Sequence, residues 1–200
     1  MPRSSGAKGL TRLRVAHLLT RLPSRLVWAA FVSINGALTM AGLALASILA
    51  GTVFLLPPLG ASAFLFFFTP ETPSASPRNA VLGYAIGIAT GVAALAITGL
   101  AGAPPVTVAG VDAARVVAAA LSLGACGGAM VLFDAVHPPA GATTLVVSLG
   151  LVSKPSQIIA LEVAIVLLLL QTIAIHRLAG VVYPLWARAR PRVERPTTGL

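Results

Sequence analysis

The fold is decided by a polar stretch with two prolines that lies between two long apolar runs. It reads Asp134-Ala135-Val136-His137-Pro138-Pro139-Ala140-Gly141-Ala142-Thr143-Thr144. Successive prolines lack N–H donors and disfavour helix in the residue before each of them. A helix over residues 116–133 should therefore break near His137. A second helix can start after the break, because proline is well tolerated in a first helical turn.

Such a restarted helix is a candidate binding site for an anion. We expect free backbone N–H groups at its start, on Ala140, Gly141, Ala142 and Thr143. Unpaired donors and the helix dipole together attract negative charge at a helix N-terminus.

The same pattern occurs once earlier in the chain. Pro57-Pro58-Leu59-Gly60-Ala61-Ser62 resembles Pro138-Pro139-Ala140-Gly141-Ala142-Thr143, and each copy follows a long apolar run. Internal repeats describe the architecture of a whole chain. The two copies differ in their polar residues, since the first has Val53 and Leu56 where the second has Asp134 and His137.

The composition identifies an integral membrane protein. Of the 200 residues, 57% are hydrophobic and only 10% are charged, and the mean hydropathy is +0.94. Soluble domains have about a quarter of their residues charged. The single cysteine, Cys126, allows no internal disulfide, and we expect it to be a small buried packing residue.

The net charge of +9 comes from the two ends of the chain. Basic residues cluster before the first apolar run and at or after the end of the last one: Arg3, Lys8, Arg12, Arg14, Arg21 and Arg25, then Arg177, Arg188, Arg190, Arg192 and Arg195. By the positive-inside rule this places both termini in the cytoplasm and implies an even number of crossings. We expect no nucleic-acid partner.

Four apolar runs are long enough to cross a bilayer, at residues 26–56, 80–100, 116–133 and 158–175. Two short segments follow the Pro-Pro copies, at residues 60–69 and 140–152, and are predicted to be half-helices. We expect a basic cytoplasmic segment over 1–25, a transmembrane domain over 26–180 with repeats at about 26–104 and 112–180, and a basic cytoplasmic tail over 181–200. Residues 1–25 could form an amphipathic helix on the membrane surface or a disordered tail, and the sequence favours neither alternative.

The predicted fold class is an all-α, polytopic membrane protein with two internal repeats. If the short segments re-enter, the halves are parallel two-helix units; if they cross, the halves are inverted three-helix units with six crossings. Matched short segments in two halves indicate a transport site. The glycines Gly83, Gly87 and Gly91 are spaced four apart and should form a smooth stripe for a neighbouring helix.

His137 is the sharpest candidate residue, because an imidazole beside a helix break in an apolar chain must be paired, face a cavity or be functional. It could cap a carbonyl freed by the prolines or carry a proton. Asp134 would share its helical face if the helix persisted. Glu162 is a third candidate for proton coupling, with an interfacial position as the alternative.

The remaining candidates lie near the first copy and the loop that follows it. Arg78 could bind an anion or act as a charge at the membrane surface. Asn79 could be a helix cap. Candidate binding residues are Gly60, Ala61, Ser62, Arg78, Asn79 and the segment His137, Pro138, Pro139, Ala140, Gly141, Ala142, Thr143 and Thr144; Ser62, Thr143 and Thr144 could instead bond helix carbonyls.

The segment from His137 to Thr143 resembles the signature of the HPP family of bacterial and plastid membrane proteins. Gly60-Ala61-Ser62 and the loop from Pro73 to Asn79 resemble two other marked stretches of that family, in the same order. The family usually has Gly-His after this loop, where this chain has Gly83-Tyr84. The resemblance implies a four-helix membrane protein and a transporter, with nitrite transport attributed to plastid and cyanobacterial members.

We therefore expect a multi-pass protein of a bacterial inner membrane that moves a small monovalent anion such as nitrite. The alternative is a membrane subunit or sensor that does not transport and whose glycine stripes bind partner helices. Scattered acids and a missing third ligand argue against an enzyme or a catalytic metal site. We expect no cofactor, and self-association stays open.

Overall fold

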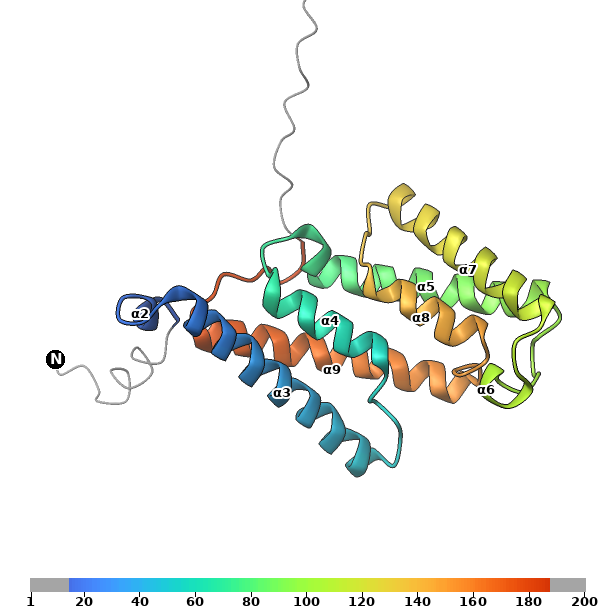
Figure 1. The fold of residues 1–200 in the computed structure, drawn as a ribbon, viewed down its shortest axis with the longest axis horizontal. Coiled ribbons are helices and arrows are strands. Elements are labelled where there is room, and N and C mark those ends of the chain that lie inside the picture. Colours follow the sequence, from blue (N-terminus) through green and yellow to red (C-terminus); the bar gives the residue numbers. More distant parts are fainter. Residues whose placement is uncertain (1–14, 188–200) are drawn as a thin grey trace, which may run out of the picture.

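The computed structural model describes residues 15–187, and this part of the chain is all-helical (Figure 1). Its elements are α2 Val15–Leu19, α3 Ser24–Ala50, α4 Pro57–Phe68, the 3-10 turn η1 Pro73–Ala75, α5 Pro77–Ile97, α6 Val106–Ala109, α7 Ala113–Leu132, α8 Pro139–Ser148 and α9 Pro155–Ala179. Most of the basic segment 1–25 and of the tail 181–200 lies outside the described residues. The predicted all-α membrane fold is confirmed, because α3, α5, α7 and α9 are long and apolar enough to cross a bilayer.

The two halves share one order of elements: a long helix, a short helix and another long helix. The apolar run 26–56 is not one helix, since α3 ends at Ala50 and Gly51 adopts a left-handed conformation with φ 61°. The chain then continues without helix to Leu56, whose φ of −116° and ψ of 140° are extended. Gly51 stops the helix because glycine accepts positive φ at no steric cost.

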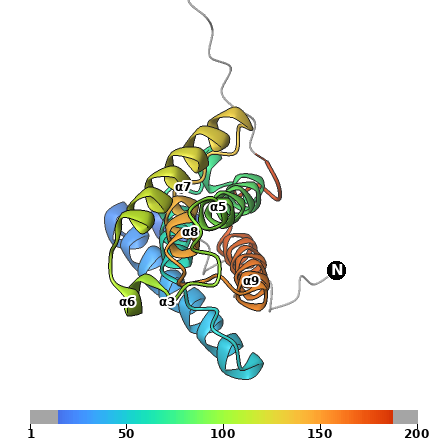
Figure 2. The same cartoon turned by 90° about the vertical axis from the view of Figure 1, so that its right-hand side faces the viewer.

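Each short helix, together with the non-helical chain before it, runs back along the bundle between two long helices. The start of α8 lies near the start of α5, where the Arg78 guanidinium bonds the carbonyl of Asp134 at 2.7 Å. Its end lies beside the loop after α5, where Val106 N–H bonds Leu149 O at 3.0 Å. In the same way α4 follows the far end of α3 and runs back along it (Figure 1). Phe67 near the end of α4 contacts Phe31 near the beginning of α3, with ring centroids 6.0 Å apart. Figure 2 shows the long helices α5, α7 and α9 beside α8 from the end of the bundle. The halves are therefore inverted three-helix units.

The glycine stripe on α5 explains how a short helix comes to lie in the interior. A Cβ added at Gly83 would lie 2.7 Å from the Cβ of His137, and one at Gly87 would lie 2.7 Å from Ala140 O. At Gly91 the nearest atom, Val147 Cβ, is also at 2.7 Å. Real Cβ atoms do not approach this closely, so α8 packs directly on the backbone of α5. The predicted partner for the stripe is found within the chain.

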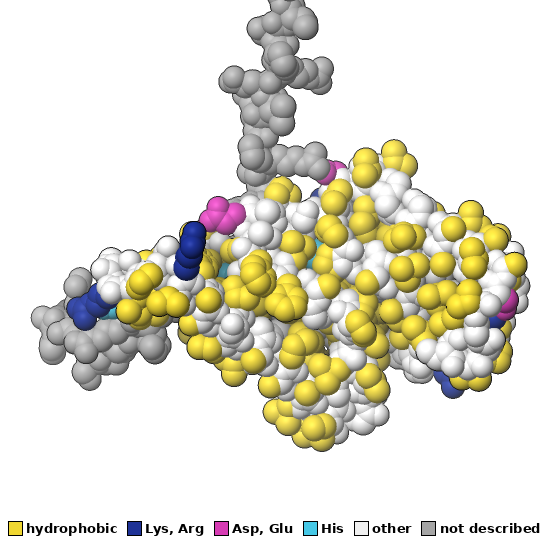
Figure 3. All heavy atoms as spheres, viewed as in Figure 1, with side chains coloured by type: hydrophobic (Ala, Val, Ile, Leu, Met, Phe, Trp, Pro, Cys, Tyr) yellow, Lys and Arg dark blue, Asp and Glu magenta, His cyan; other side chains and the backbone are white. Residues whose placement is uncertain are grey.

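Hydrophobic and polar side chains are distributed as expected for a protein in lipid. Figure 3 shows a largely hydrophobic face with charged side chains at its edges. Large apolar side chains such as Ile48, Leu49 and Leu132 are more than three-quarters exposed. Several polar side chains are instead fully buried, among them Thr39, Ser62, His137, Thr143, Thr144 and His176. Because polar groups are costly inside a membrane, this buried set marks where a site should be sought.

Candidate functional site

The helix break begins earlier than predicted. Helix α7 ends at Leu132, and Asp134 has a left-handed φ of 53°. Ala135 N–H bonds Met130 O at 2.8 Å, which closes the helix end in a Schellman-type motif. The helix does not persist to His137, so the condition for Asp134 and His137 to share a helical face is not met.

Arg78 and Asn79 hold the broken segment in place. Arg78 Nη1 donates to Asp134 O at 2.7 Å, and Nη2 lies 3.5 Å from Phe133 O. Asn79 Nδ2 donates to Val136 O at 3.3 Å, while the helix cap is the hydroxyl of Ser76, which accepts from Asn79 N–H. A cation at the C-terminal end of α7 is also favoured by the helix dipole. These contacts give both residues a positioning role.

His137 lies at the centre of the site and is fully buried. Its Nδ1 lies 2.8 Å from the carbonyl oxygen of Ser74, and its Nε2 lies 2.8 Å from Ser62 Oγ. Ser62 belongs to the first Pro-Pro copy and His137 to the second. The two repeats thus meet through their candidate polar residues.

Tyr84 completes this contact and was not among the candidates from sequence. Its hydroxyl lies 2.8 Å from Ser62 Oγ and donates to Pro58 O at 3.0 Å. Its ring centroid is 5.4 Å from that of His137, and the Phe66 ring stacks on His137 at 5.7 Å. The available signal was its position directly after Gly83, at the start of the glycine stripe.

Two threonines of α8 extend the polar interior. Thr144 Oγ1 bonds Thr90 Oγ1 of α5 at 2.9 Å. Thr143 Oγ1 is buried and makes no hydrogen bond to any described residue, although it lies near the Tyr84 hydroxyl. The alternative in which Thr143 bonds a helix carbonyl is not what the structure shows. A buried hydroxyl without a partner is a donor available to a ligand.

The start of α8 does not offer the free amides expected from sequence. Ala140 N–H bonds His137 O at 3.0 Å, and Gly141 N–H bonds Pro138 O at 2.9 Å. In α4, Leu59 N–H likewise bonds Leu56 O at 3.0 Å. Tight i to i+3 bonds satisfy these donors at both helix starts. The prediction that the amides of Ala140 and Gly141 are free is therefore wrong.

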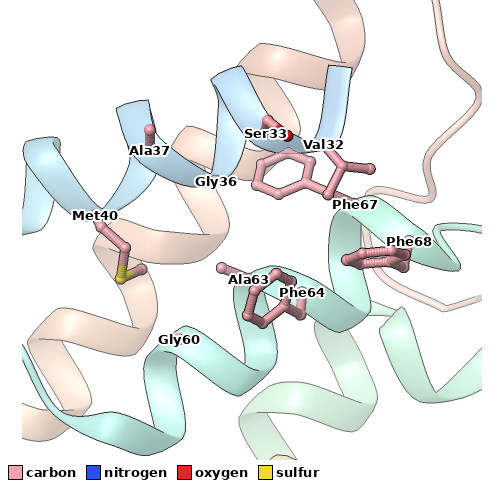
Figure 4. Close-up of a pocket in the computed structure, with 10 residues that line it drawn as sticks. All are labelled: Val32, Ser33, Gly36, Ala37, Met40, Gly60, Ala63, Phe64, Phe67 and Phe68. Carbon is pink, nitrogen blue, oxygen red and sulfur yellow. The ribbon is translucent and has the colours of Figure 1, made fainter. Parts of the chain in front are cut away.

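No neighbouring helix comes close to the backbone at Gly60 or Gly141, the glycines of the two Pro-Pro copies. A Cβ at Gly60 would meet nothing within 4 Å, and one at Gly141 would meet only Leu123 Cδ1, at 3.5 Å. Gly60 instead faces a groove of about 380 Å³ between α3 and α4, which Figure 4 shows lined by Gly36, Met40 and phenylalanines of α4. A second groove between α4 and α8 is lined by Ala61, Pro138, Pro139 and Ala142, among others.

The remaining titratable candidates lie around this centre. Glu162 on α9 is partly buried and close enough to interact electrostatically with Tyr84. His176, which the sequence reasoning passed over, is fully buried between aromatic rings, with centroids 5.3 Å from Phe67 and 4.6 Å from Tyr183. Cys126 is buried, as predicted. Residues 15–187 contain no group of three His, Cys, Asp or Glu that could hold a metal.

An ion pair lies at the start of α7. Asp112 caps α7 by accepting from Arg115 N–H at 2.8 Å and pairs with the Arg115 guanidinium. Arg115 also donates to Pro104 O at 2.7 Å. These bonds from Arg115 hold the pKa of Asp112 below its usual range. The pair fixes the connection between the two halves.

Membrane-length apolar helices, two short helices between them and a polar interior define a multi-pass membrane protein. The family description "HPP, transmembrane region" matches residues 20–189, and the chain belongs to this family. A transmembrane protein of Dictyostelium discoideum is 36% identical over 98 residues, which are 48% of this chain and 27% of that protein. This chain thus corresponds to about a quarter of that relative's length. No solved structure matches the chain.

Proposed function

We propose that this HPP-family protein transports a small solute across the membrane, by a path through the contact between α4 and α8. The observation that carries the proposal is the Ser62–His137 bond of 2.8 Å, which joins the two broken crossings in the interior. Short, interrupted helices in matching positions of two halves are typical of transport sites.

A small monovalent anion suits the chemistry of this site. The Thr143 hydroxyl makes no hydrogen bond to a described residue and is therefore a donor available to an anion. His137, Ser62 and Tyr84 lie beside it, bonded to one another, and no carboxylate is bonded directly to these side chains among the described residues. Hydroxyl and imidazole donors stabilise negative charge in a buried site. Nitrite is the first candidate because transport of this ion is attributed to relatives in the family.

The experiment is uptake into proteoliposomes with nitrite, nitrate and formate as anions and urea as a neutral solute. We expect nitrite uptake above that of protein-free liposomes, and its loss in Thr143→Val. Ser122→Ala is the matched control, because its hydroxyl bonds Ser148 on another part of α8. If urea is taken up and none of the anions is, the proposal of an anion substrate is wrong. If no solute is taken up, the proposal of transport is wrong.

A membrane subunit that binds partner helices is the second candidate. It is favoured by α7, where Gly124, Gly127 and Gly128 have nothing within 4 Å of an added Cβ. Small residues permit close helix contact in lipid. Purified protein that moves solute without a partner would exclude this role as the sole function.

We also propose that the protein lies in a bacterial inner membrane with both termini in the cytoplasm. The basic ends of the chain support this orientation. After removal of Cys126, labelling of Ser4→Cys and Thr198→Cys in intact cells tests it. Rapid reaction of either site with an impermeant reagent from outside would contradict the orientation.

A further inference from the structure

We infer that the buried chain from Ser74 through His137, Ser62 and Tyr84 to Pro58 is a binding site for one proton, held on His137 Nε2. The inference deepens the proposed function and depends on it only for the coupling of that proton to transport. It follows from counting the protons that the four contacts of the chain require.

The two ends of the chain are carbonyl oxygens, which only accept. Ser74 O requires a proton on His137 Nδ1, and Pro58 O requires the hydroxyl proton of Tyr84. With its proton used, the Tyr84 oxygen must accept from the Ser62 hydroxyl, 2.8 Å away. Ser62 Oγ must then accept from His137 Nε2, also at 2.8 Å. All four bonds form together only if both ring nitrogens carry protons.

A neutral imidazole leaves the chain one proton short. Neutral His137, Ser62 and Tyr84 supply one proton each, which is enough for three of the four contacts. A bond from the Thr143 hydroxyl to Tyr84 would add one proton and also one contact that needs it. The chain would still be one proton short. The chain therefore has two states that differ by one proton.

Loss of the proton leaves three protons for the four contacts, so the hydrogen bonds of the chain rearrange. The Nε2–H bond breaks and its proton passes to water, after which the Ser62 hydroxyl turns to donate to Nε2. The Tyr84 hydroxyl can then donate either to Ser62 Oγ or to Pro58 O, so one of its two contacts with α4 is lost. Protonation is thereby linked to the contact between α5 and α4.

The surroundings contain several groups that act on this charge. Burial opposes the imidazolium, while the rings of Phe66 and Tyr84 stabilise a cation near their faces. The titratable and charged groups nearest the chain are Tyr84 on α5, Glu162 on α9, and Asp134 and Arg78 at the helix break. Tyr183 contacts the Phe66 ring, and His176 stacks on Tyr183. A charged Glu162 opposes negative charge on Tyr84.

The test is nitrogen-15 NMR of histidine-labelled protein in lipid nanodiscs, titrated between about pH 4 and pH 9, across the histidine range. His137→Gln assigns the signal among the three histidines. We expect both nitrogens of His137 to be protonated at low pH and a neutral form with Nδ1–H at high pH. A signal that stays in one neutral form throughout would overturn the inference.

Tyr84→Phe provides the sharper comparison, because it removes two contacts and one proton and leaves neutral His137 and Ser62 fully bonded. The midpoint of the His137 titration should fall by about one pH unit, because the protonated form no longer gains one extra bond over the neutral form. Tyr183→Phe is the matched control, since its hydroxyl bonds Ala75 O outside the chain, and it should not shift the midpoint. Ser62→Ala should lower the midpoint as well and replaces Tyr84→Phe if that variant does not fold.

An unchanged midpoint in both Tyr84→Phe and Ser62→Ala would overturn the inference. The titration needs no transported solute, so its failure is distinguishable from failure of the proposed function. If the protein transports solute but His137 does not titrate, only the proton site is rejected. If His137 titrates but no solute is transported, only the proposed solute path is rejected.

Discussion

Ser62 and His137 are 75 positions apart in the chain and are joined by a bond of 2.8 Å between Oγ and Nε2. Each belongs to one of the two Pro-Pro copies, so this bond joins buried polar side chains of the two repeats. The glycine stripe of α5 makes the contact possible, because it lets His137 and α8 approach the α5 backbone. The predictions below test these two features and the connections around them.

Replacing His137 should separate stability from pH dependence. His137→Gln cannot reach both Ser74 O and Ser62 Oγ, so we expect a loss of about 1–3 kcal/mol in the free energy of unfolding. Any remaining nitrite uptake should be equal at about pH 5.5 and pH 8, on either side of the histidine range. His176→Gln, at the other fully buried histidine, should keep the pH dependence. Unchanged pH dependence in His137→Gln would exclude a role for this imidazole.

Gly87 should tolerate a side chain far less well than Gly141. In Gly87→Ala the added Cβ would lie 2.7 Å from the backbone oxygen of Ala140, and we expect a destabilisation of about 1–3 kcal/mol. In Gly141→Ala the Cβ meets one side-chain atom at 3.5 Å, so stability should be unchanged or higher by about 0.4–1 kcal/mol. Thermal unfolding in detergent measures both. Equal midpoints would mean that α8 does not pack as described.

Arg78 should act on the shape of the site and not on the solute directly. Arg78→Gln removes the charge and the bonds to Phe133 O and Asp134 O, so unfolding should become easier and maximal uptake should fall. The solute concentration for half-maximal uptake should stay the same. Arg177→Gln, at the end of α9, is the comparison variant. A large rise in the half-maximal concentration would instead show that Arg78 binds the anion.

The Asp112–Arg115 pair should stabilise the protein at neutral pH and lose this effect in acid. The pKa of Asp112 is lowered in the folded state, so its contribution is present above the unfolded value of about 4 and is lost as pH falls through the lower folded value. We expect Asp112→Ala to unfold more easily than the wild type at pH 7. At about pH 3 and below, the difference should shrink. A constant difference would show that the carboxylate charge is not involved.

Much of this protein was determined by its sequence. The apolar runs and the basic ends predicted a multi-pass helical membrane protein, and the two Pro-Pro copies predicted the short helices. These features are local, because hydrophobicity and proline act on the few residues around them. The same reasoning selected Ser62 and His137 as candidates, although it could not show that they touch.

The tertiary structure decided which groups in the site are free and which are bonded. The amides of Ala140 and Gly141 were predicted to be donors for an anion, but short-range turns use them. Close approach belongs to Gly83, Gly87 and Gly91 instead of Gly60 and Gly141, because it depends on which helix covers each residue. Tyr84 joined the site for the same reason: its hydroxyl reaches Ser62 and Pro58 only because packing brings α4 within reach of this side chain on α5. Contacts between distant segments depend on packing, which no local pattern of residues specifies.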